Sequence, residues 1–172
     1  MLESAIKANN GNPPLAAQLA QWKFSERGSQ SKTYREDDVQ AAFCLQQLRN
    51  DVVFDGIKLV ATEFLMVKSN KRIDVLGVKD STLYVFEMKK GRDNSAYGQA
   101  ENYKVELEDN LTEYLRLLKY YPNINNDITL YAVKTIAVME WNKKHRLENK
   151  SHWLYELPKN YDFSKNLVFR KN

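Results

Sequence analysis

Apolar and polar positions alternate along the chain in blocks, and their spacing predicts where helices and strands lie. From about Tyr34 to Arg49 the apolar side chains recur at helical spacing, which predicts a helix. Three β-rich runs follow, separated by the turn-forming pairs Ser69-Asn70 and Asp80-Ser81. Because such turns are short, we expect three antiparallel neighbours, at Ile57–Val67, Arg72–Val78 and Leu83–Lys89.

A second, longer helix is predicted after Gly91. One apolar stripe keeps helical spacing from near Asn94 to just before Tyr121-Pro122. The largely apolar run Ile128–Val138 then predicts another strand. Outside this core we expect two short helices, at Leu2–Ala8 and Leu15–Phe24, and two short strands, around His152–Leu157 and Leu167–Arg170.

The core order is therefore helix, three strands, helix, strand. This order predicts an α/β fold in which helices flank a mixed central sheet. A length of 172 residues suits one domain with a usable core. Within the single domain 1–172 we distinguish an N-terminal helical extension at 1–31, a core at 32–140 and a basic C-terminal extension at 141–172.

The composition narrows the class of protein. A hydrophobic fraction of 43% with 12% aromatic residues favours a folded globule over a disordered chain. No apolar run approaches the roughly 20 residues that cross a bilayer, so we expect no membrane association. The single cysteine, Cys44, excludes an internal disulfide and is expected in the core, which favours a reducing, cytoplasmic compartment.

The formal net charge of +4 is unevenly distributed. Residues 1–56 carry −1, residues 57–140 are neutral, and residues 141–172 carry +5. A basic surplus of this kind permits a polyanionic partner. A solvated basic tail is the alternative.

Three charged residues stand in the apolar runs at the middle of the chain. Asp74 interrupts one run, and Glu87 and Lys89 close the next. A carboxylate in an apolar strand is costly unless it is paired, and two carboxylates on neighbouring strands can share a divalent cation. Glu87 and Lys89, two residues apart, share one face of a strand. The pattern predicts a Mg²⁺ or Mn²⁺ site beside a lysine that contacts a reacting phosphate, and a salt bridge at a strand end is the alternative.

In these residues and in its order of elements the chain resembles the PD-(D/E)XK nuclease superfamily. Asp74 matches the aspartate of the family's central hairpin, and Glu87-Met88-Lys89 matches its (D/E)-x-K motif. Gln99 and Tyr103 match the Gln-x-x-x-Tyr motif of branches that trim or nick DNA and of the nuclease domains of type I restriction enzymes. The proline of the family's name is absent, and Ile73 stands in its place.

The resemblance spans about Tyr34 to Val138 and implies both a fold and an activity. The fold would be a restriction-endonuclease-like αβββαβ core with a mixed central sheet flanked by helices. The activity would be Mg²⁺- or Mn²⁺-dependent hydrolysis of phosphodiester bonds in DNA, by an endonuclease or nickase rather than an exonuclease. The implied roles are metal binding by Asp74 and Glu87, orientation or activation of the attacking water by Lys89, and substrate positioning by Gln99 and Tyr103.

Two further carboxylates are candidates for completing the metal site. Many family members carry a glutamate on the first core helix, and Glu36 fits because it lies on the inward face of the predicted helix. The alternative for Glu36 is a capping box with Thr33. Glu63 is a candidate if Leu65 pairs with Asp74, since Glu63 then shares the face of Asp74. A slip of one residue would turn Glu63 to solvent.

Basic residues flank the predicted site and fill the C-terminal extension. Phosphate contacts from such side chains position a nucleic acid without reading its sequence, and a solvated surface charge is the alternative for each. Trp141, Trp153 and Tyr155 are either base-stacking or core residues. The candidates for DNA binding are Lys68, Lys71, Arg72, Lys90, Arg92, Lys143, Lys144 and Arg146.

DNA is thus the expected partner, and two rival functions remain open. One is a non-catalytic module that binds nucleic acid or protein on the same fold, against which the intact set of Asp74, Glu87 and Lys89 argues. The other is an accessory subunit of a defence or mobile-element system that cuts only with a partner protein. Whether the chain acts as a monomer or a homodimer also stays open.

Overall fold

The computed structural model describes residues 35–49, 55–121, 124–141, 151–156 and 168–171. The helices expected within 1–31, the residue Thr33 and the basic residues Lys143, Lys144 and Arg146 lie outside these ranges. None of the described helices combines the length and apolar character that crossing a bilayer requires.

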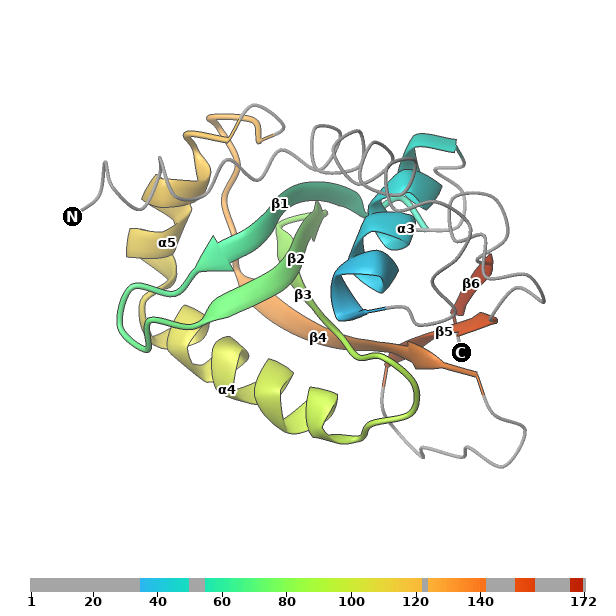
Figure 1. The fold of residues 1–172 in the computed structure, drawn as a ribbon. Coiled ribbons are helices and arrows are strands. Elements are labelled where there is room, and N and C mark those ends of the chain that lie inside the picture. Colours follow the sequence, from blue (N-terminus) through green and yellow to red (C-terminus); the bar gives the residue numbers. More distant parts are fainter. Residues whose placement is uncertain (1–34, 50–54, 122–123, 142–150, 157–167, 172) are drawn as a thin grey trace.

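The described strands form one sheet in which the spatial order follows the chain order (Figure 1). β1 (Lys58–Leu65), β2 (Arg72–Lys79) and β3 (Thr82–Met88) are antiparallel neighbours, which confirms the predicted meander. The two-residue turn between β2 and β3 has φ of +46° at Asp80 and +58° at Ser81. Left-handed residues at both positions match the twist of the flanking strands, as in a type I′ hairpin.

Three more strands extend the sheet. β4 (Ala132–Glu140) runs parallel to β3, and β5 (His152–Glu156) runs parallel to β4. β6 (Val168–Lys171) then pairs antiparallel with β5. The α/β class with a mixed sheet is confirmed, and the two short strands expected near the C-terminus belong to this same sheet.

Helix α3 (Glu36–Arg49) covers one face of the sheet. Its Phe43 packs against Phe86 of β3, with ring centroids 5.1 Å apart, and against Trp153 of β5 at 6.0 Å. Cys44 is buried in the same cluster, as expected, and burial raises the pKa of its thiol to about 12. A thiol held protonated in this way is a core residue and not a nucleophile.

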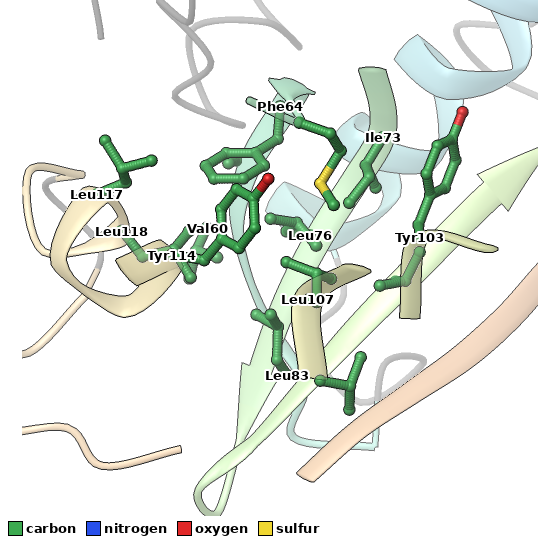
Figure 2. Packing of buried hydrophobic residues seen from close by; sticks show 14 of the residues in the cluster. Val60, Phe64, Ile73, Leu76, Leu83, Tyr103, Leu107, Tyr114, Leu117 and Leu118 are labelled. Carbon is green, nitrogen blue, oxygen red and sulfur yellow. The ribbon is translucent and has the colours of Figure 1, made fainter. Parts of the chain in front are cut away.

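Helices α4 (Ser95–Asp109) and α5 (Leu111–Leu118) cover the opposite face. Figure 2 shows this second cluster, in which strand side chains such as Phe64 and Leu83 meet Leu107 of α4 and Tyr114 of α5. Each large side chain that is fully buried in this way contributes about 2 kcal/mol. Two apolar layers therefore hold the sheet from both sides, which fixes the strand ends where the charged residues lie.

The prediction of one long helix ending before Tyr121 is wrong, because α4 and α5 are separated at Asn110. This residue has φ of −135°, outside the helical range. Its Nδ2 donates a hydrogen bond to the backbone oxygen of Glu106 at 2.9 Å, and its Oδ1 accepts one from Nζ of Lys68. A side chain that competes for backbone partners in this way interrupts a helix.

The prediction for the start of β4 is also wrong, since the strand begins at Ala132 and not at Ile128. The N–H of Ile128 instead donates to the oxygen of Asn125 at 3.1 Å, which closes a turn. The N–H of Tyr131 donates to the oxygen of Ser81 at 2.9 Å and leads the chain into the sheet.

Candidate active site

The ladder between β2 and β3 ends beside Asp74. The last backbone pair is Val75 with Phe86. Beyond it, Oδ2 of Asp74 accepts a hydrogen bond from the N–H of Met88 at 2.6 Å, so a side chain takes the place of a ladder carbonyl. From this point β2 and β3 diverge toward opposite ends of α4 (Figure 1).

Glu87 and Lys89 lie at the end of β3 and are both buried, with 3% and 9% of their surfaces exposed. Nζ of Lys89 donates to Oε1 of Glu87 at 3.1 Å. The other oxygen, Oε2 of Glu87, is buried and has no hydrogen-bond partner among the described residues. A buried carboxylate oxygen without a partner is costly, and a bound cation would satisfy it.

Asp74, Glu87 and Lys89 shift one another's pKa values. Burial and the negative charge of Glu87 raise the pKa of Asp74 to about 8, although the hydrogen bond from Met88 opposes the shift. Burial also raises the pKa of Glu87, and the charge of Lys89 offsets part of that rise. Burial disfavours the charged form of Lys89, but the carboxylates of Glu87, Glu36 and Asp74 outweigh it and raise the lysine's pKa. Shifts of this kind are typical of functional sites.

Glu36 reaches this group from the start of α3. Its Oε2 lies 3.6 Å from Nζ of Lys89, on a side chain that is 52% exposed. At the same helix end, Oδ2 of Asp38 accepts from the N–H of Arg35 at 2.7 Å, so Asp38 closes back on the first turn. The alternative role of Glu36 as a cap involves Thr33, which lies outside the described residues.

Glu63 faces Asp74, although the strand register differs from the expected one. Leu65 pairs with Arg72 and not with Asp74, so Glu63 itself stands opposite Asp74. The observed strand register differs from the expected one by two positions. Because side chains alternate between the two faces of a strand, a shift of two leaves Glu63 on the same face as Asp74. Glu63 has φ of +51°, an uncommon left-handed conformation for a residue other than glycine. Its charge contributes to the raised pKa of Asp74.

Tyr103 of α4 joins the core and the site. Its ring is buried in the cluster of Figure 2, where its hydroxyl points away from the other labelled side chains. Burial and the charges of Glu87, Asp74 and Glu63 raise the pKa of Tyr103 to about 12. Gln99 is half-buried one turn earlier on α4, and within the described residues no hydrogen bond joins it to these carboxylates.

Gln40 of α3 is a residue near the site that the sequence did not identify. Its Nε2 donates to Oε1 of Glu63 and to the backbone oxygen of Asp74, each at 2.7 Å. The signal in the sequence is slight: Gln40 is polar and follows Glu36 by four residues, which places both on one helix face.

Tyr155 of β5 also supports the site, from behind. Its hydroxyl donates to the backbone oxygen of Lys89 at 3.0 Å and accepts from the N–H of Gly91 at 3.0 Å. Tyr155 and Trp153 are each 0% exposed, so neither stacks on a base, and the core alternative for both is correct. Gly91 has φ of +72°, a conformation that suits glycine in the loop that follows Lys89.

The described basic candidates lie in two groups, one at each end of α4. Lys68 and Lys71 belong to the β1–β2 turn, and Arg72 is the first residue of β2. The N–H of Lys68 donates to Oε1 of Glu106 at 3.2 Å, which ties this turn to the C-terminal part of α4. Lys90 and Arg92 precede the N-terminus of that helix. All five are exposed. Arg72 donates to the backbone oxygen of Glu63 at 3.1 Å, and Nζ of Lys68 donates to Oδ1 of Asn110.

The residues present fit a divalent cation in their chemistry. Asp74 and Glu87 supply the oxygen ligands that Mg²⁺ and Mn²⁺ prefer, and none of the described residues gives the buried Oε2 of Glu87 a hydrogen bond. In the part of the chain that the structure describes, no group of three or more His, Cys, Asp or Glu side chains is already arranged to hold a metal ion. Glu63 stands opposite Asp74 in the sheet, and Oε2 of Glu36 lies 3.6 Å from Nζ of Lys89, so these two carboxylates are the candidates for a third protein ligand.

Protein-family models, curated proteins and solved structures were compared with the chain, and none matches it. The resemblance to PD-(D/E)XK nucleases therefore rests on the motif residues and on the order of the elements.

Proposed function

We propose that this chain is a Mg²⁺- or Mn²⁺-dependent deoxyribonuclease with a restriction-endonuclease-like αβββαβ core. It would act as an endonuclease or nickase. The observation that carries the proposal is the meeting of Asp74, Glu87 and Lys89 where β2 and β3 separate. One buried oxygen of Glu87 has no hydrogen-bond partner there within the described ranges of the chain. The order of α3, three antiparallel strands, α4–α5 and a parallel β4 supports the fold assignment.

Lys89 is the group that acts on the water and the phosphate. In the metal-free chain the charges of Glu87, Glu36 and Asp74 raise the pKa of Lys89, so Nζ is protonated there and is a hydrogen-bond donor and a positive charge. Nζ already donates to Oε1 of Glu87, which fixes the direction of the side chain. In this proposal Lys89 would orient an attacking water and stabilise negative charge on a phosphodiester.

Asp74 and Glu87 would hold the cation, with Glu63 as the third carboxylate. The bound metal would supply Lewis acidity and positive charge to the reacting phosphodiester. In its absence the two carboxylates repel one another, which contributes to the raised pKa of Asp74. Metal binding would therefore displace protons from this pair.

The two exposed basic groups at the ends of α4 would contact the DNA backbone on either side of the carboxylates. Glu106 lies eleven positions after Ser95 on α4, which corresponds to about 17 Å at 1.5 Å per residue. At 3.4 Å per base step this is about five steps of a duplex. A bound DNA would therefore bring a phosphate between the two groups to the carboxylates.

The proposal is tested by incubating the full chain with supercoiled, linear and single-stranded DNA in Mg²⁺, Mn²⁺ or EDTA. Nicked or linear product from supercoiled DNA in metal, and none in EDTA, is the expected result. Glu87→Gln and Lys89→Met should abolish cleavage. Their matched controls, Glu108→Gln and Lys119→Met, change exposed residues of α4 and the end of α5 and should cut as the unmodified chain does.

One observation favours a second candidate, a non-catalytic binding module on the same fold. Among the described residues no three-ligand metal group is already assembled. Titration calorimetry with Mn²⁺ separates the two candidates, because a binding module has no use for the metal at Asp74 and Glu87. An accessory subunit would bind Mn²⁺ but cut DNA only after a partner protein is added.

A further inference from the structure

Gln40 joins three parts of the site through one amide. Its Nε2 carries two hydrogens, and both are used: one reaches Oε1 of Glu63 and the other the backbone oxygen of Asp74, each at 2.7 Å. Helix α3 is thereby fixed to β1 and β2 at the position where Glu63 and Asp74 face one another. Both partners are acceptors, so only a donor group suits this place.

Glu63 needs such a contact to stay at the site. It is an exposed side chain, on a backbone held at φ of +51°. A left-handed residue within a strand is strained, and strain of this kind persists where the surroundings hold it. Two contacts hold it: Gln40 binds the carboxylate, and Nη1 of Arg72 donates to the backbone oxygen at 3.1 Å. Without the amide, a carboxylate on a flexible stem would turn to solvent.

We propose that Gln40 is a positioning residue that keeps the Glu63 carboxylate beside Asp74 and thereby raises the affinity of the site for a divalent cation. The inference rests on the proposed function and goes beyond it, because it assigns a role to a glutamine outside the catalytic motif. It also assigns Arg72 to the support of Glu63, in addition to any contact with DNA. Residues that orient metal ligands typically change metal affinity or activity by about 10- to 100-fold when replaced.

The test is calorimetric titration of Mn²⁺ into the full chain and its Gln40→Met variant, which keeps the side-chain length and removes the amide. The dissociation constant should rise about tenfold. Gln46→Met is the matched control, since Gln46 is a half-buried glutamine of the same helix and should leave Mn²⁺ affinity unchanged. Gln40→Asn, which keeps the amide on a shorter side chain, gives a second version should Gln40→Met fail to fold in EDTA.

A double replacement shows whether Gln40 acts through Glu63. In a Glu63→Ala background, Gln40→Met should weaken Mn²⁺ binding less than about threefold, because the carboxylate that it positions is gone. Equal affinities for the Gln40→Met and Gln46→Met chains, or an undiminished tenfold loss in the Glu63→Ala background, would overturn the inference. Failure of the unmodified chain to bind Mn²⁺ is a different result, which refutes the proposed metal site itself.

Discussion

The N–H of Met88 donates to Oδ2 of Asp74 across 2.6 Å, at the point where backbone pairing between β2 and β3 ends. The Asp74 carboxylate therefore closes the end of the β2–β3 pairing, and it also lies close enough to Glu87 for the two charges to interact. Because only one of its two oxygens is needed for this bond, the other is left for a cation or a proton.

The stability of the metal-free chain should fall as pH rises, because of Asp74. Its folded pKa is about 8, whereas an unfolded aspartate titrates near ~3.9. The folded state therefore keeps a proton that the unfolded state has lost, and the stabilisation is complete below about pH 4 and is lost as pH rises toward 8. The slope for one such proton is at most about 1.4 kcal/mol per pH unit.

Asp74→Asn should reduce this dependence, since an amide keeps the acceptor for Met88 and has no proton to lose. Glu87, whose pKa is also raised, will leave part of the slope. Urea denaturation in EDTA at pH 5 and pH 8 measures the effect. An equal loss of stability over this range in Asp74→Asn and the unmodified chain would contradict the assigned proton.

Lys89→Met should destabilise the metal-free chain, because it leaves the buried carboxylate of Glu87 without its donor. We expect about 2 kcal/mol, less than the 3–5 kcal/mol for a fully buried pair, since the lysine side chain keeps contact with solvent. The double variant Glu87→Gln/Lys89→Met should recover part of this loss. Denaturation midpoints in EDTA measure both, and Lys119→Met is the exposed control. Midpoints for Lys89→Met and Lys119→Met that coincide would show that the pair does not stabilise the fold.

The fold and the site differ in how far the sequence predicts them. Most of the described helices and strands begin and end within two residues of the predicted positions, because apolar periodicity determines these positions. The exceptions are the break between α4 and α5 and the start of β4. The motif residues Asp74, Glu87 and Lys89 were also found, because charged residues in apolar runs are conspicuous. The break at Asn110 depends on a contact with Lys68 from a distant turn, which local periodicity does not contain.

The supporting roles of Gln40 and Tyr155 could not be predicted from the sequence, for the same reason. Gln40 donates hydrogen bonds to acceptors that lie 23 and 34 residues away along the chain. Tyr155 donates to a backbone oxygen 66 residues away. Neither residue type is unusual for its helix or strand. Their roles arise only when the sheet brings β1, β2 and β5 together with α3.

Tyr155→Phe should lower the rate of DNA cleavage far more than removal of an exposed tyrosine hydroxyl does. Removing the hydroxyl takes a donor from the oxygen of Lys89 and an acceptor from the N–H of Gly91, at a cost of about 1–3 kcal/mol. Release of the loop displaces Lys89, and small displacements of this kind reduce rates by up to about 100-fold. Single-turnover cleavage rates measure this, with the exposed Tyr120→Phe as control. A rate equal to that of the control would remove Tyr155 from the support of the site.

The basic groups are expected to set the salt dependence of DNA binding. Each phosphate contact contributes about 0.9 to the slope of log affinity against log salt concentration. Lys71→Gln and Lys90→Gln, one from each end of α4, should therefore each flatten the slope by about that amount. Replacing Lys143, Lys144 and Arg146 together should flatten it by about 2–3 if all three contact phosphates. DNA binding is measured in EDTA at salt concentrations from about 50 to about 200 mM. Slopes equal to that of the control Lys119→Gln would show that these residues are solvated surface charges that do not contact phosphates.

Cleavage of supercoiled DNA in Mn²⁺ by the unmodified chain and by Asp74→Asn, side by side, tests whether catalysis depends on a metal ion held by Asp74 and Glu87. We expect nicked or linear product from the unmodified chain, no product in EDTA, and no product from Asp74→Asn, with urea denaturation at pH 8 as the check that this variant is folded. Full cleavage by Asp74→Asn, or cleavage that persists in EDTA, would contradict a metal-dependent site at Asp74 and Glu87.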